Sequence, residues 1–207
     1  MINWFGWAAL GLFIAYLACF FWGNARISQA AGRSVWLFGT ARGRDRWAAA
    51  GFRAAFVLSF LGPIAWLAFP GLHKLDPLWT AGRFPLIGLA GVGLACGGAL
   101  LAIVAQVSMG TSWRVGVQAG ATGDLVSSGL FRFSRNPTFV GQAALLAGVA
   151  LAVPSAPTIL AALLFLWSAT SQIRSEEAAL RQSLGQEYER YAASVPRWIG
   201  LRRMGAK

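Results

Sequence analysis

Long apolar runs with few charges recur along the chain, and they constrain its fold more than any other feature. The runs cover about residues 3–21, 47–69, 84–109, 137–153 and 158–173. A run of about 20 apolar residues can cross the roughly 30 Å hydrocarbon core of a bilayer as an α-helix, and the last two runs are near the lower limit. Only 12% of the residues are charged, about half the share in a soluble domain. We therefore expect an all-α integral membrane bundle of about five transmembrane helices.

The positive charges lie in the gaps between these runs. With five spans, segments 24–53, 110–136 and 174–207 share one side of the membrane and hold 6, 3 and 7 of the 18 Lys and Arg residues. The other side holds only Lys74 and Arg83. Basic loops stay in the cytoplasm, so we expect an outside N-terminus in a plasma membrane, taken here as a bacterial inner membrane. The net charge of +11 then reflects membrane topology, and we expect no nucleic-acid partner.

Two polar motifs flank the last two apolar runs. The first motif is Arg135-Asn136-Pro137-Thr138-Phe139, and the second is Arg174-Ser175-Glu176-Glu177. Residues 140–173 between them carry no charge. A chain that crosses a bilayer and returns brings both ends to one face, so the two motifs should meet. Their mixed charges suit a zwitterionic ligand with an ammonium and a carboxylate group.

The segment before the first motif is a second place for chemistry. Residues 110–136 are too polar for a span and too long for a simple turn, and such long loops are often functional. Asp124 and neighbouring amides could bind a polar ligand, and Phe131 and Phe139 could enclose an aromatic base. Simpler interpretations remain open: Asn136 and Pro137 suit a helix start, and the two glutamates suit a solvated helix face.

Residues 174–192 are predicted to form an amphipathic helix that continues from the last span. Leu180, Leu184, Tyr188 and Tyr191 fall on one face of such a helix. Glu177 and Arg181 have the spacing of an ion pair on a helix surface. The helix is expected to end at residues 195–197.

Two smaller features are assigned to helix packing. Gly93 and Gly97 have the GxxxG spacing of a close contact between membrane helices. Cys19 and Cys96 fall in separate apolar runs and are interpreted as small core residues rather than as a disulfide. We also expect no metal site, because His73 is the only histidine.

The order of residues in the C-terminal half resembles the isoprenylcysteine carboxyl methyltransferase family and related membrane methyltransferases of phospholipids and thiols. The pattern is Leu125-Val126-x-x-Gly129-x-Phe131-x-x-x-Arg135-Asn136-Pro137-x-Phe139-x-Gly141, then Glu176-Glu177-x-x-Leu180, then Gly185-x-Glu187-Tyr188-x-x-Tyr191-x-x-x-Val195-x-Arg197. It covers about residues 107–197. Three positions depart from the family, which usually has His at Asn136 and Tyr at Phe131 and Phe139.

The resemblance implies S-adenosylmethionine as cofactor, bound on the cytoplasmic side. The resemblance and the mixed charges of the two motifs together predict the cofactor-binding residues. These are Gly123, Asp124, Leu125, Val126, Phe131, Arg135, Asn136, Pro137, Thr138, Phe139, Glu176 and Glu177. The family also places an arginine for the substrate shortly before the glutamates. Arg174 is the predicted catalytic residue on this ground, and Gln172 is the alternative for that position.

These observations predict a single membrane domain over residues 1–207. Residues 1–109 would form the acceptor side, and residues 110–197 the methyltransferase-like cofactor region. The expected function is methyl transfer to a lipophilic or membrane-associated carboxylate, amine or thiol, with the bilayer and this acceptor as partners. The alternatives are a nicotinamide-dependent reductase of the sterol or steroid type and a non-enzymatic membrane scaffold.

Overall fold

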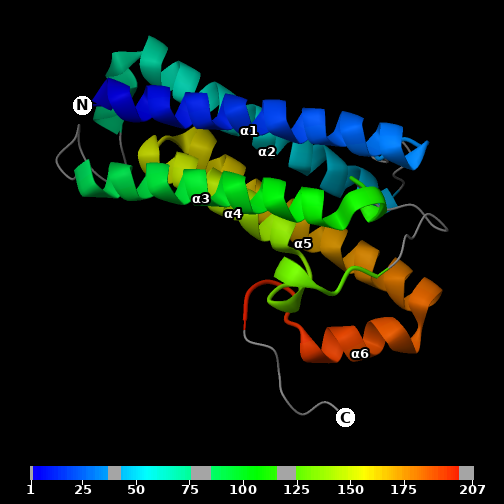
Figure 1. Cartoon of the computed structure of the whole chain (residues 1–207). Helices are drawn as coiled ribbons and strands as arrows, with labels where there is room; N and C mark the ends of the chain where they lie inside the picture. Colours follow the sequence, from blue (N-terminus) through cyan, green and yellow to red (C-terminus); the bar gives the residue numbers. More distant parts are fainter. Residues whose placement is uncertain (1, 37–42, 76–84, 116–124, 201–207) are drawn as a thin grey trace.

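The protein is a bundle of long helices (Figure 1). The computed structural model describes residues 2–36, 43–75, 85–115 and 125–200. Its α-helices are α1 (Ile2–Ala31), α2 (Gly43–Ala68), α3 (Pro85–Met109), α4 (Pro137–Ala152), α5 (Ala156–Leu184) and α6 (Gln186–Ser194). Short 3₁₀ helices cover Pro70–Leu75, Gly110–Ser112 and Gly129–Arg132. The described ranges contain no strand beyond one isolated bridge between Trp36 and Val115, so the all-helical prediction is confirmed.

Four helices, α1, α2, α3 and α5, are long and apolar enough to cross a membrane. The shorter apolar helix α4 has 16 residues and rises about 24 Å, so the chain is a membrane helical bundle. The first predicted span ended too early, because α1 continues to Ala31. No Gly or Pro interrupts residues 24–31. The helix ends where Gly32 takes a φ of +62°, which favours glycine.

Helices α3 and α4 are in backbone contact through small residues. A Cβ added to Gly91 would lie 2.5 Å from the Ala152 nitrogen, and one added to Gly141 would lie 2.5 Å from the Ala102 nitrogen. Only glycine permits this approach. The predicted packing residues were wrong: a Cβ on Gly93 or Gly97 meets no described atom within 4 Å. These two glycines lie on the outer side of α3 and are exposed.

Aromatic side chains join α1, α2 and α5, and the ring centroids of Phe13 and Phe56 are 5.8 Å apart. The ring centroids of Phe52 and Phe56 are 4.8 Å apart, and those of Phe52 and Phe165 are 5.6 Å apart. This stacking fixes Phe52 near one end of the bundle. The cysteines, by contrast, do not belong to this core. Cys19 is exposed and Cys96 is partly exposed, so the expectation that both are core residues was wrong.

Helices α4 and α5 form the predicted hairpin around residues 153–155. The start of α4 and the C-terminal part of α5 therefore lie at the same end of the bundle, together with residues 129–132 and α6 (Figure 1). The predicted single helix over residues 174–192 is instead two helices. The chain turns at Gly185, whose φ is +52°, and α6 folds back toward residues 129–132, where Tyr191 contacts Phe131.

Candidate active site

A cavity at this end of the bundle contains residues from both polar motifs. It offers about 100 Å³ of space to the centre of a water-sized sphere. Its lining residues are Phe20, Phe52, Met109, Trp113, Arg114, Val115, Leu125, Val126, Phe131, Arg135, Asn136, Pro137, Thr138, Phe139, Gln142, Gln172, Glu176, Glu177, Leu180, Tyr188 and Tyr191. The prediction that the two motifs meet is thus confirmed.

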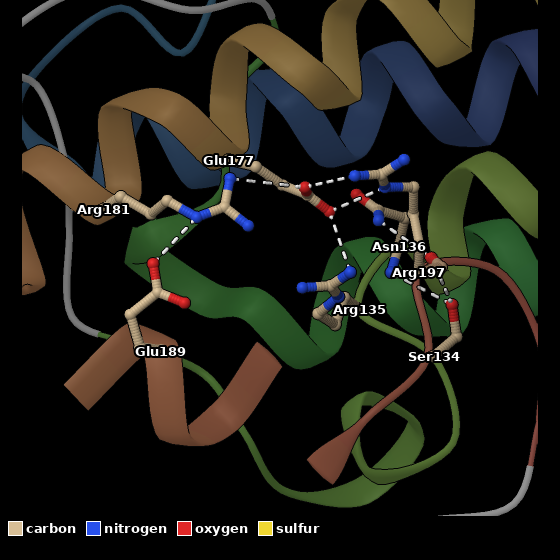
Figure 2. Close-up of polar contacts among 7 residues, drawn as sticks. All are labelled: Ser134, Arg135, Asn136, Glu177, Arg181, Glu189 and Arg197. Atoms are coloured by element: carbon tan, nitrogen blue, oxygen red, sulfur yellow. Dashed lines mark hydrogen bonds and ion pairs between the residues drawn. The ribbon is translucent and has the colours of Figure 1, made fainter. Parts of the chain in front are cut away.

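Glu177 is the centre of an arginine cluster at the cavity (Figure 2). Its carboxylate is 3% exposed and pairs with Arg135 at 3.1 Å and Arg197 at 2.6 Å. Arg181, one turn further along α5, pairs with it at 3.7 Å. The predicted pair between Glu177 and Arg181 is present, although Glu177 is buried rather than on the surface. A buried carboxylate needs such partners, because its desolvation is otherwise very costly.

Glu176 pairs with a residue for which the sequence predicted no role. The Arg114 Nη2 lies 3.2 Å from Glu176 Oε1, and the Arg114 side chain is only 6% exposed. Trp113 beside it donates from Nε1 to Asn24 Oδ1 at 2.6 Å, and Gln106 Nε2 donates to the same oxygen at 3.0 Å. A buried polar contact between α1 and α3 thus fixes the segment that carries Arg114.

The C-terminal segment after α6 packs against the residues that lead into α4. The Arg135 amide donates to the Pro196 carbonyl at 2.9 Å, and the Asn136 side chain donates to the Arg197 carbonyl at 2.9 Å. Pro137 begins α4 as expected, but the Asn136 side chain makes no capping hydrogen bond within the described structure. The Tyr191 hydroxyl also donates to the Phe131 carbonyl at 2.8 Å.

Burial also changes the pKa of Tyr188 on α6. Desolvation, with a further contribution from the Glu177 carboxylate, raises the pKa of Tyr188 to about 12. The phenol therefore stays neutral at physiological pH and forms part of the cavity wall without adding a charge.

Most of the predicted cofactor-binding residues line this cavity: Leu125, Val126, Phe131, Arg135, Asn136, Pro137, Thr138, Phe139, Glu176 and Glu177. Gly123 and Asp124 lie outside the described residues. Among the described residues, Arg174 is not in this lining; it lines a separate outer groove with Trp47 and Trp167. Gln172 lines the cavity instead. Helical periodicity explains this, because position 174 is turned about 200° from position 172, whereas 172 and 176 share a face.

Three buried polar atoms of the cavity residues have no hydrogen-bond partner within the described structure: Arg135 Nε, Thr138 Oγ1 and Gln172 Nε2. Leaving such groups unpaired costs about 1–3 kcal/mol each. Native proteins rarely accept this cost without a reason. The cavity therefore suits a ligand that provides hydrogen-bond acceptors.

A family model described as phospholipid methyltransferase matches residues 86–187. Across this stretch the chain is similar to the phospholipid methyltransferase family. A relative described as a protein-S-isoprenylcysteine O-methyltransferase, from Schizosaccharomyces pombe, is 31% identical over 121 residues. That alignment covers 57% of this chain and 51% of the relative, so the chain spans about half the length of that protein. These matches confirm the family predicted from the motifs, and they do not favour the reductase alternative.

The stretch that matches the phospholipid methyltransferase model contains both partners of two ion pairs, Arg114–Glu176 and Arg135–Glu177. Arg114, Arg135, Glu176 and Glu177 all lie within residues 86–187. Arg197 lies beyond it, although its guanidinium makes the shortest ion pair to Glu177. The helices that give this chain its apolar cavity wall include α1 and α2, which precede the matched stretch.

Proposed function

We propose that this chain is an integral membrane methyltransferase that uses S-adenosylmethionine and methylates a lipophilic acceptor. The observation that supports this best is the cavity itself. Two charged motifs from one hairpin converge there, and apolar side chains of α1 and α2, Phe20 and Phe52, form its other wall. A water-soluble zwitterionic cofactor and a hydrophobic acceptor therefore have complementary surfaces in one space.

The charged residues fit the amino-acid end of S-adenosylmethionine. We assign Glu176 to its ammonium group or ribose hydroxyls, and Arg135, whose Nε has no described partner, to its carboxylate. Glu177 already pairs with three arginines, so it would position Arg135. Phe131 and Phe139 would enclose the adenine, and residues 123–126, 136 and 137 would complete the site.

When bound, S-adenosylmethionine supplies an electrophilic methyl carbon, to which an acceptor lone pair bonds while the carbon–sulfur electron pair stays on sulfur. The protein's contribution would be to align the two reactants, which accounts for much of the acceleration in such reactions. A carboxylate acceptor would need no base, whereas a protonated amine or thiol would. Arg174 remains a predicted acceptor contact, and from its outer groove it would meet the acceptor at the membrane surface.

The membrane orientation belongs to the same proposal. The excess of Lys and Arg beside the cavity end of the bundle supports a cytoplasmic site in a plasma membrane, where S-adenosylmethionine is available. Residues 1–109 would shape the acceptor side, since Phe20, Phe52 and Met109 line the cavity. Residues 110–197 would bind the cofactor.

Calorimetry with S-adenosylmethionine and with a reduced nicotinamide cofactor tests this function. We expect only S-adenosylmethionine to bind, and we expect Glu176→Ala to abolish this binding while the protein stays folded. Glu187→Ala, an exposed change on α6 outside the cavity lining, is the matched control and should bind normally. Labelled methyl transfer to extracted membrane lipids and thiols then identifies the acceptor. Binding of neither cofactor would favour the scaffold.

A further inference from the structure

Uncharged polar side chains form a second layer of the cavity, beneath the arginines and glutamates. Gln172 lies one turn of α5 deeper than Glu176, and Thr138 and Gln142 follow Arg135 on the first two turns of α4. One turn corresponds to about 5.4 Å along the helix. The cavity therefore changes from charged to neutral as it enters the apolar bundle.

Gln142 already has a partner in this layer. Its Nε2 donates to the Tyr16 hydroxyl at 2.7 Å, and each residue is only 2% exposed. This hydrogen bond joins α4 to α1 and fixes the wall of the cavity. Gln142 is thus explained by the fold, without a ligand.

Thr138 and Gln172 have no such explanation. They are 7% and 5% exposed, and both line the cavity from different helices. Thr138 Oγ1 and Gln172 Nε2 have no hydrogen-bond partner among the described residues. Two unpaired polar groups on facing helices of one cavity are the arrangement expected where a ligand completes the hydrogen bonds.

We propose, on the basis of the function proposed above, that Thr138 and Gln172 form the subsite for the head group of the methyl acceptor. The unpaired Gln172 Nε2 can only donate, and the Thr138 hydroxyl can also donate. Their ligand must therefore provide lone pairs, as the oxygen of a carbonyl, hydroxyl or carboxyl group does. An alkylammonium group has no lone pair and would leave the Gln172 Nε2 unpaired.

The surroundings indicate the rest of the acceptor. Phe20 and Phe52 line the cavity from α1 and α2, and they provide an apolar surface for a hydrocarbon chain. The acceptor class is thus a lipophilic molecule with a hydrogen-bond-accepting oxygen in its head group. The arginines and glutamates of the charged layer would bind the amino-acid end of the cofactor.

Binding of two probes with the same chain tests this subsite. Dodecanol carries an oxygen acceptor, and dodecyltrimethylammonium carries none. Calorimetry is done on the protein in lipid nanodiscs with saturating S-adenosylhomocysteine, which has no methyl group to transfer. We expect dodecanol to bind more tightly than dodecyltrimethylammonium. We expect Gln172→Leu and Thr138→Val each to weaken dodecanol binding by about 3- to 10-fold, which is the effect of one lost hydrogen bond.

Ser168→Ala is the matched control, because Ser168 is one turn deeper on α5, buried and without a described partner, yet outside the cavity lining. It should leave dodecanol binding unchanged. Gln172→Leu should not lower the thermal midpoint of the ligand-free protein, since it removes an unpaired amide. Equal dodecanol affinity in the wild type and both variants, or no dodecanol binding at all, would overturn the subsite. Failure of the wild type to bind S-adenosylmethionine would instead overturn the proposed function.

Discussion

Arg197 binds Glu177 through both of its carboxylate oxygens, from Nε to Oε1 at 2.9 Å and from Nη2 to Oε2 at 2.6 Å. The two residues are 20 positions apart, and a turn at Gly185 and the whole of α6 lie between them. This paired contact, visible in Figure 2, holds the C-terminal segment over the residues that lead into α4. The geometry is the strong two-point form of an arginine–carboxylate interaction.

Removing this contact should loosen the C-terminal segment. We expect Arg197→Gln to lower the free energy of unfolding by about 1–2 kcal/mol, at the lower end for a hydrogen bond to a charged group, because the Arg197 side chain is 36% exposed. Protease cleavage after α6 should become faster. Arg190→Gln is the control, since Arg190 is exposed and bonds only weakly to Gln186 at 3.4 Å. Equal cleavage of the two variants would contradict this role of Arg197.

The pair between Arg114 and Glu176 should be energetically coupled. Arg114→Gln leaves the Glu176 carboxylate without its cation, so we expect a loss of about 1–3 kcal/mol in unfolding free energy. Adding Glu176→Gln should recover part of this loss, since the neutral pair no longer leaves a single unpaired charge. A double-mutant cycle measures the coupling, expected at about 0.5–3 kcal/mol for residues in contact. Strictly additive losses would show that the two side chains do not interact.

The close contact between α3 and α4 can be tested by comparing a glycine inside the contact with a glycine of α3 outside it. Gly148→Ala places a methyl group against the Ala95 backbone, and such overpacking usually costs about 1–3 kcal/mol. Gly97→Ala faces open space and should be neutral or slightly stabilising, as alanine in a helix is preferred over glycine by about 1 kcal/mol. Thermal unfolding in detergent compares the two. Equal destabilisation would contradict the packing described here.

The sequence predicted the elements better than the contacts between them. Hydrophobic runs and the Asn136-Pro137 pair were enough to place the start of α4, because these signals are local. Arg114 was missed because its partner is 62 positions away, and nothing in local composition pairs one arginine with one glutamate. The glycines were misassigned for a related reason. GxxxG spacing is present at Gly93 and Gly97, but which face of α3 meets α4 depends on the whole bundle.

The position of Arg174 could have been anticipated from the sequence. It follows Gln172 by two residues and precedes Glu176 by two, so a continuous helix turns it away from both. Because Arg174 is close in sequence to the glutamates, it was expected in the cavity. Helix geometry instead favours the outer groove, where the structure places it. Family motifs therefore need to be read together with helical phase.

Alkaline pH should destabilise the protein through Tyr188. Its pKa is raised from 10.0 to about 12 in the folded protein, so the folded state holds the phenol proton over a pH range in which the unfolded chain has lost it. This contribution to stability is complete below pH 10 and is lost as the pH rises to about 12. The loss amounts to about 1–3 kcal/mol, since one pKa unit corresponds to about 1.4 kcal/mol. We expect Tyr188→Phe to flatten the fall in unfolding free energy over this range, measured by denaturant titration at pH 9 to 12. An unchanged slope would show that Tyr188 does not control the alkaline limit.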